Sequence, residues 1–165
     1  MRIVEGVAVV EDVDAFVASL GAVGDEHGVA VQAFDAAYVA GREHVESAVT
    51  HAARAFDRGA NVADERAVEI LLYAAGRRQI RRALDMGVDE GRQPVCVVVA
   101  GGGDEAAAAD AVAAMLASVE PVVGAASEPA VLRAFFDVSE AEMAAVDGSL
   151  AGVVRERVAL LDVEK

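Results

Sequence analysis

Residues 69–83 read EILLYAAGRRQIRRA, an apolar segment that ends at a glycine and is followed by arginines. The apolar residues recur at helical spacing on more than one side and predict an enclosed central helix from Asp64 to Ala75. Gly76 is typical of the residue that ends such a helix. A second, short helix is expected from Arg77 to Met86, before Gly87.

The arginines at the start of this second helix could form an anion-binding site. Arg78 and Arg82 are four residues apart and would share a helix face, as would Arg77 and Arg81. A helix N-terminus offers free backbone N–H groups, and planar guanidinium groups match phosphate and stack on bases. Gln79 could hydrogen-bond a base edge. Alternatively, the arginines pair with acidic neighbours on a solvated face, namely Asp85, Asp89 and Glu90.

The remaining pattern predicts a single α+β domain over residues 1–165. Strands are expected at Arg2–Val10, Val29–Phe34 and Pro94–Ala100, the last apolar throughout, which indicates burial on both faces. Further helices are expected at Asp12–Leu20, Glu43–Arg58, Asp104–Val119, Glu128–Phe136, from Ser139 onward and at Leu150–Leu161, with a loop at Gly21–Gly28. Strands and helices do not alternate strictly. We therefore expect a small mixed sheet of at least three strands packed with about six or more helices.

Charge is distributed unevenly along the chain. The formal net charge is −14, from 28 acidic and 14 basic residues, and Lys165 is the only lysine. Residues 1–41 sum to −6, residues 93–165 to −8 and residues 42–92 to zero. The middle segment is therefore the only part of the chain where acids do not outnumber cations, and a nucleic-acid phosphate would bind there if anywhere.

The acidic composition, rich in alanine and valine, resembles that of proteins from salt-loving archaea, where acidic surfaces keep proteins hydrated. In such an organism, the net charge would indicate the habitat more than the binding partner. At molar ionic strength the Debye length is about 3 Å, so an RNA site would depend on short bidentate hydrogen bonds and stacking. Arginine provides both, although general avoidance of lysine predicts the same composition.

A second arginine group consists of Arg42, Arg54 and Arg58, on or beside the helix that precedes the motif. Arg54 and Arg58 are four residues apart and could extend a cationic track. Equally, these arginines could pair with the neighbouring acids, which are Glu43, Glu46 and Asp57.

No motif predicts a catalytic, metal or cofactor site, so we expect a protein that is not an enzyme and needs no cofactor. His44 and His51 are seven residues apart, too far for one metal ion without other ligands. The segment from Gly101 to Ala106 fits a loose dinucleotide-binding pattern. However, Asp104 lies in the first turn of the helix that follows the glycines and would repel phosphate. A tight turn that lets the following helix pack on the sheet is the simpler explanation.

Location and redox state are also constrained. No apolar run approaches the roughly 18–20 residues of a membrane-spanning helix, and the start of the chain lacks a secretion signal. We expect a cytoplasmic protein without membrane contact. The single cysteine, Cys96, is expected to be a buried strand residue.

The stretch from Glu69 to Ala83 resembles the small accessory subunit of the KEOPS complex, a family related to the human p53-related-kinase-binding protein. That family has a Glu-x-Leu-Leu-Tyr helix, a glycine or small residue, a variable residue and Arg-Gln-Ile-x-x-Ala. The segment from Gly41 to Ala48 is similar to the family's His-hydrophobic-x-x-Ala segment. Asn61 follows the helix that this segment begins, as an asparagine often does in the family. The similarity is strongest over about residues 33–88.

The resemblance implies a non-catalytic subunit of a complex that attaches a threonylcarbamoyl group to the adenosine beside the anticodon in tRNAs that read codons starting with A. A separate transferase subunit performs the chemistry. A kinase-like ATPase subunit binds the transferase on one side and the accessory subunit on the other. The accessory subunit is expected to bind the single-stranded 3′ CCA end of tRNA.

The resemblance also suggests site residues. Arg78 and Gln79 carry over as RNA-binding residues by motif match, and His44 carries over more weakly. The other RNA-binding candidates follow from charge rather than from the motif, and they are Arg77, Arg81, Arg82 and Arg54.

Two other function classes stay open from the sequence. The chain could be a structural or regulatory activator of the kinase-like subunit that touches no RNA, with Ala106 to Ala117 as a candidate face. Core packing explains those alanines more simply. An enzyme is the third class and has the least support.

Overall fold

A four-stranded sheet lies at the centre of the structure, a computed structural model that describes residues 1–146 and 148–164. Its strands are β1 (Arg2–Val10), β2 (Ala30–Asp35), β3 (Gly91–Ala100) and β4 (Ser118–Val119), arranged in the order β2-β3-β1-β4. Every pair is antiparallel, so the expected mixed sheet is wrong in this detail. The α+β fold class is confirmed.

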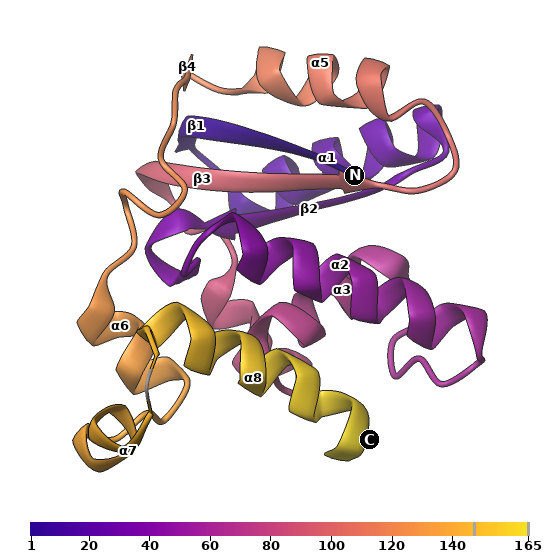
Figure 1. The fold of residues 1–165 in the computed structure, drawn as a ribbon. Coiled ribbons are helices and arrows are strands. Elements are labelled where there is room, and N and C mark those ends of the chain that lie inside the picture. Colours follow the sequence, from indigo (N-terminus) through magenta and orange to yellow (C-terminus); the bar gives the residue numbers. More distant parts are fainter. Residues whose placement is uncertain (147, 165) are drawn as a thin grey trace.

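Helices cover both faces of the sheet (Figure 1). One face carries α1 (Val13–His27) and α5 (Glu105–Met115), and the other carries α2 (Arg42–Asp57) and α3 (Arg66–Ala75). Helix α8 (Leu150–Glu164) packs against α2 and α3 on their side away from the sheet. The short helices are α4 (Ile80–Ala83), α6 (Pro129–Phe135) and α7 (Glu140–Ala145), with 3₁₀ turns at Ala36–Tyr38 and Leu84–Met86.

Strand β3 separates two apolar cores. Cys96 and Val98 face the core of α2, α3 and α8, while Val95, Val97 and Val99 face the core of α1 and α5. All five residues are fully buried, as the continuous apolar run predicts.

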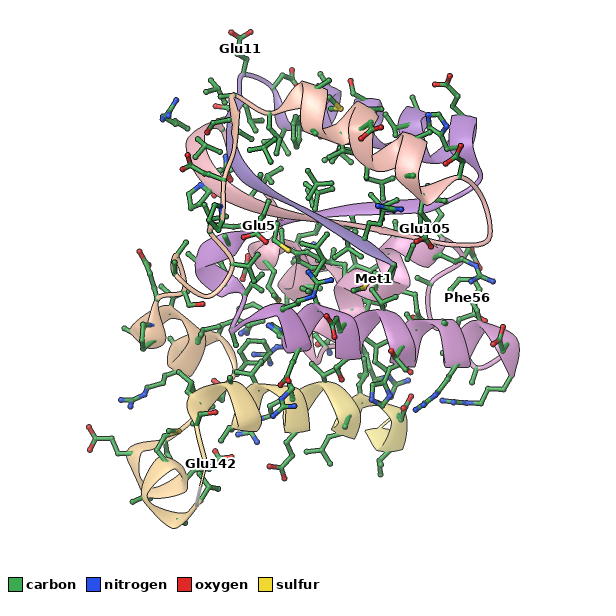
Figure 2. All side chains as sticks on the ribbon, turned by 45° about the horizontal axis from the view of Figure 1, so that its top comes forward. Met1, Glu5, Glu11, Phe56, Glu105 and Glu142 are labelled. Carbon is green, nitrogen blue, oxygen red and sulfur yellow. The ribbon has the colours of Figure 1, made fainter. Side chains whose placement is uncertain are left out.

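The N-terminus is tied to the helix that follows β3. The ammonium group of Met1 lies 2.8 Å from the carboxylate of Glu105, and Figure 2 shows the two residues beside each other. The hydrogen bond from this ammonium group lowers the pKa of Glu105. The pair fixes the start of β1 against the start of α5.

Helix α3 is enclosed as predicted, since every residue from Glu69 to Ala75 is buried. The carboxylate of Glu69 accepts hydrogen bonds from the backbone N–H groups of Val62, at 2.9 Å, and Ala63, at 3.3 Å. These bonds satisfy a buried charge and hold the loop before α3.

Two expected boundaries are wrong. Helix α1 continues to His27 through the expected loop at Gly21–Gly28, because a glycine at Gly24 lets the helix approach the carbonyl of Val29 closely. Helix α5 stops at Met115, since Ser118–Val119 pairs with β1 as β4. Tertiary packing overrides local helix preference at both places.

His44 joins α2 to the end of α3. Its Nδ1 accepts a hydrogen bond from the Ala40 N–H at 3.1 Å, so Nε2 carries the proton and donates to the Ala74 carbonyl at 2.8 Å. The ring also packs edge-on against Phe136. Burial lowers the pKa of His44 to about 4.

We predict a stability that depends on this histidine in mild acid. Between about pH 6.5 and pH 4 the unfolded chain binds a proton at His44 that the folded chain does not. The free energy of unfolding should therefore fall as pH falls through this window, by up to about 3 kcal/mol. Urea unfolding at several pH values measures the slope. His44→Gln should flatten it, and an unchanged slope would contradict the assignment.

A second prediction concerns the turn after α3. Gly76 has φ +60°, and a Cβ there would lie 3.1 Å from the carbonyl oxygen of Arg157 on α8. Gly59 has φ +68° with nothing within 4 Å of a Cβ, so Gly59→Ala measures the backbone cost alone. Gly76→Ala should destabilise the chain by more than the roughly 1–2 kcal/mol expected for Gly59→Ala. Equal losses in chemical denaturation would show that α8 does not constrain the turn.

Candidate functional site

The arginine-rich segment begins as a turn rather than as a helix. The N–H groups of Gly76 and Arg77 bond to the carbonyls of Tyr73 and Leu72, each at 3.0 Å, and close the end of α3. Helix α4 begins only at Ile80 and contains four residues. The helix expected from residue 77 and its N-terminal anion site are therefore wrong, because the left-handed glycine redirects the chain.

Arg77 anchors this turn to α6. Its guanidinium group donates to the carbonyl of Phe135, lies 5.2 Å from the centre of the Phe135 ring and is 3.5 Å from a carboxylate oxygen of Asp137. The side chain is mostly covered. Arg77 is thus a positioning residue for the loop that follows it.

Four polar side chains of the loop and α4 are exposed, and we name them the arginine patch: Arg78, Gln79, Arg81 and Arg82. Arg81 and Arg82 form no ion pair with any other residue in the part of the chain that the structure describes. Their acidic neighbours form none within those same ranges either, and these are Asp85, Asp89 and Glu90. The arrangement favours an open cationic surface over the paired alternative for Arg81 and Arg82.

His44 and Tyr73 lie away from this surface. His44 is 1% exposed and Tyr73 is fully buried, so neither ring can stack on a base in this conformation. We therefore remove His44 from the candidate RNA-binding residues and assign it the structural role described above. The aromatic residue of the family motif has a structural role as well.

Tyr73 belongs to a polar cluster centred on Asp162 of α8. The carboxylate of Asp162 accepts from the Tyr73 hydroxyl, from Nδ1 of His51 at 2.5 Å and from the Arg58 guanidinium at 3.0 Å. Burial and the bond to Asp162 raise the pKa of Tyr73. Burial raises the pKa of Asp162, but the hydrogen bonds from Tyr73 and His51 outweigh it and the net shift is downward. The cluster fastens α8 across α2 and α3.

The second arginine group does not join the patch. Arg42 pairs with Glu46 at 2.6 Å, as the paired alternative expects, and Arg58 pairs with Asp162. Arg54 is exposed in the last turn of α2. Because α2 and α3 run in opposite directions, Arg54 lies near the start of α3, about 15 Å along the helix from the turn at Gly76.

Two exposed apolar residues border the arginine patch. Ile80 is 47% exposed and Leu84 is 58% exposed, and they are four residues apart in a continuous helical segment. The sequence alone identifies Ile80 only as part of a motif. The adjacent Arg81 and Arg82 are the sequence feature that indicates an exposed segment, because arginines are rarely buried.

The structure does not support the other candidate sites that the sequence raised. Within residues 1–146 and 148–164, no group of three His, Cys, Asp or Glu side chains could hold a metal ion. None of the described helices is long and apolar enough to cross a membrane. The candidate face on α5 packs into the core through Ala108 and Val112, both fully buried.

Comparison with known families adds one finding. A family model described as "Kinase binding protein CGI-121" matches residues 14–162. A search of curated protein sequences gave no significant match. The matched range runs from the first turn of α1 to the last turn of α8 and includes the enclosed helix and the arginine patch. The chain belongs to the CGI-121 family of kinase-binding proteins.

Proposed function

We propose that this chain is a non-catalytic subunit of the KEOPS complex, which forms threonylcarbamoyladenosine in tRNA. In this role it binds the kinase-like ATPase subunit directly and the transferase subunit only through that ATPase. Membership of a kinase-binding family is the observation that carries the first part of this proposal. The expected cytoplasmic location is consistent with this role and remains a proposal.

We further propose that the arginine patch binds the 3′ CCA end of tRNA. Arg78 and Gln79 match the family motif, and Arg81 and Arg82 are exposed without ion pairs among the described residues. Guanidinium groups offer bidentate bonds to phosphate and flat surfaces for unstacked bases. The Gln79 amide can donate to and accept from a base edge.

The fold supports this use of the patch. The turn is fixed at one end by the bonds that close α3 and is anchored to α6 through Arg77. A pre-ordered loop loses less conformational entropy on binding than a free one. In an overall acidic chain, such order is needed because long-range attraction to RNA is weak.

Arg78→Ala should weaken tRNA binding by about 1–3 kcal/mol, roughly 5- to 150-fold in Kd, because a bidentate or stacking contact is lost. Fluorescence titration with whole tRNA and with tRNA lacking its 3′ CCA measures this at high salt. Removal of the 3′ CCA should strongly weaken tRNA binding by the wild-type chain, but it should weaken binding by Arg78→Ala only slightly.

Arg2→Ala is a matched control, since it removes one exposed arginine from β1. It should leave the Kd almost unchanged. Arg54→Ala tests how far the site extends, and we expect a smaller loss than for Arg78→Ala. Full binding by Arg78→Ala with an intact fold, or equal binding of whole and trimmed tRNA, would favour an activator that contacts no RNA.

For the kinase-like subunit, we predict that Ile80 and Leu84 lie in the interface. Both expose apolar area that a partner could cover. Leu84→Glu should weaken the complex at least 10-fold in a binding titration with the purified kinase-like subunit. The control Val119→Glu alters an equally exposed apolar residue on β4, at the far edge of the sheet. Equal effects of both changes would place the interface elsewhere.

A further inference from the structure

Strand β2 forms an open edge of the sheet, since it pairs with β3 on one side only. In antiparallel sheets, successive residues direct their backbone N–H and C=O groups to alternate sides. The carbonyls of Glu5 and Val7 on β1 accept bonds from the segment around β4. The strand register extends the same alternation through β3 to β2. The backbone N–H and C=O groups of Val31 and Ala33 therefore point outward, away from β3.

These outward backbone groups are almost all unpaired. No hydrogen bond from another described residue reaches the N–H or C=O of Val31 or the N–H of Ala33. The remaining group, the Ala33 carbonyl, accepts from Nε2 of Gln32 at 2.8 Å. Since Val31 and Ala33 are only 7% and 4% exposed, these groups are also poorly hydrated. An additional strand would provide the hydrogen bonds that these backbone groups do not obtain from water or from the rest of the chain.

The edge lies at the floor of a slot between helices. Helix α1 forms one wall, while α3 and the segment from Ile80 to Val88 form the other. Two cavities of about 500 and 600 Å³ follow the edge and share Gly21, Val31, Glu65 and Ala67. The two cavities therefore adjoin along β2, and we call them together the slot.

The shape and chemistry of the slot restrict its occupant. Because helices stand on both sides of the edge, the slot suits a single extended chain better than a folded sheet, such as that of a second copy of this chain. Exposed apolar side chains stand on both walls, with Val17 on α1 opposite Ile80 and Leu84. The charged lining residues are three acids and one arginine, namely Asp14, Asp25, Glu65 and Arg66, which favours a basic occupant.

We propose that the slot along β2 binds an extended, basic peptide segment of a protein partner, which joins the sheet as a strand beside β2. Backbone bonds to Val31 and Ala33 give the affinity, and apolar side chains at alternate positions enter the slot. A segment of about five residues, roughly 16 Å long, covers the open edge. This site does not depend on tRNA binding, but its wall includes Ile80 and Leu84, which also belong to the proposed interface with the kinase-like subunit.

Gly21 offers a substitution that fills the slot without harming the fold. It lies within α1, lines both cavities, and a Cβ there would meet nothing within 4 Å. Gly21→Leu should support the helix better than glycine does while its side chain occupies the path of the peptide. Ala22→Leu is the matched control, because Ala22 is exposed on the same helix and lines neither cavity.

The test selects peptides from a random nine-residue display library on the full chain and measures the best synthetic peptide by fluorescence anisotropy. We expect apolar residues at every second position with lysine or arginine between them. Binding to Ala22→Leu should equal wild type, and binding to Gly21→Leu should be at least 10-fold weaker. Bound peptide should slow amide exchange at Val31 and Ala33, measured by NMR.

Three results would overturn the proposal. The first is a selection that enriches no peptide, and the second is a selected peptide that binds Gly21→Leu as tightly as wild type. The third is binding without slowed exchange at Val31 and Ala33, which would indicate a helical ligand on the apolar walls rather than an added strand.

Discussion

Burial of α3 on all sides is the constraint on which the rest of the structure depends. A helix enclosed in this way must have each of its polar groups satisfied by the elements around it. The carboxylate of Glu69 binds the preceding loop, the carbonyl of Ala74 accepts from His44, and the hydroxyl of Tyr73 reaches Asp162 on α8. The preceding loop, α2 and α8 are thereby held against one helix, and the position where that helix ends is fixed.

That fixed end gives the proposed RNA surface its geometry. The chain turns at Gly76, is anchored through Arg77, and then exposes Arg78 and Gln79. The result is a rigid base beneath a short cationic loop, which suits contacts that act at close range. The same segment continues into Ile80 and Leu84, so the proposed RNA and protein surfaces lie side by side without sharing residues.

The sequence predicted the parts of the fold that follow from local patterns. The enclosed helix, the doubly buried strand β3 and the α+β class are examples. It did not predict that α1 continues through Gly21 or that β4 forms, because tertiary contacts decide both. It also did not predict that residues 77–79 are non-helical, because the left-handed Gly76 redirects the chain there. The buried role of His44 was also missed, since an isolated histidine in a motif carries no sign of its burial. The cluster around Asp162 joins residues about a hundred positions apart, which no single-sequence pattern reveals.

The central claim is that the loop leaving the enclosed helix is the place where unpaired RNA binds. Hydrogen–deuterium exchange of the full chain, with and without a tRNA that ends in CCA, tests it most directly. We predict that bound tRNA slows exchange most strongly in peptides covering residues 77–84, while the amides of α3 stay protected in both states. Saturating tRNA that leaves residues 77–84 unchanged and protects another surface would contradict it.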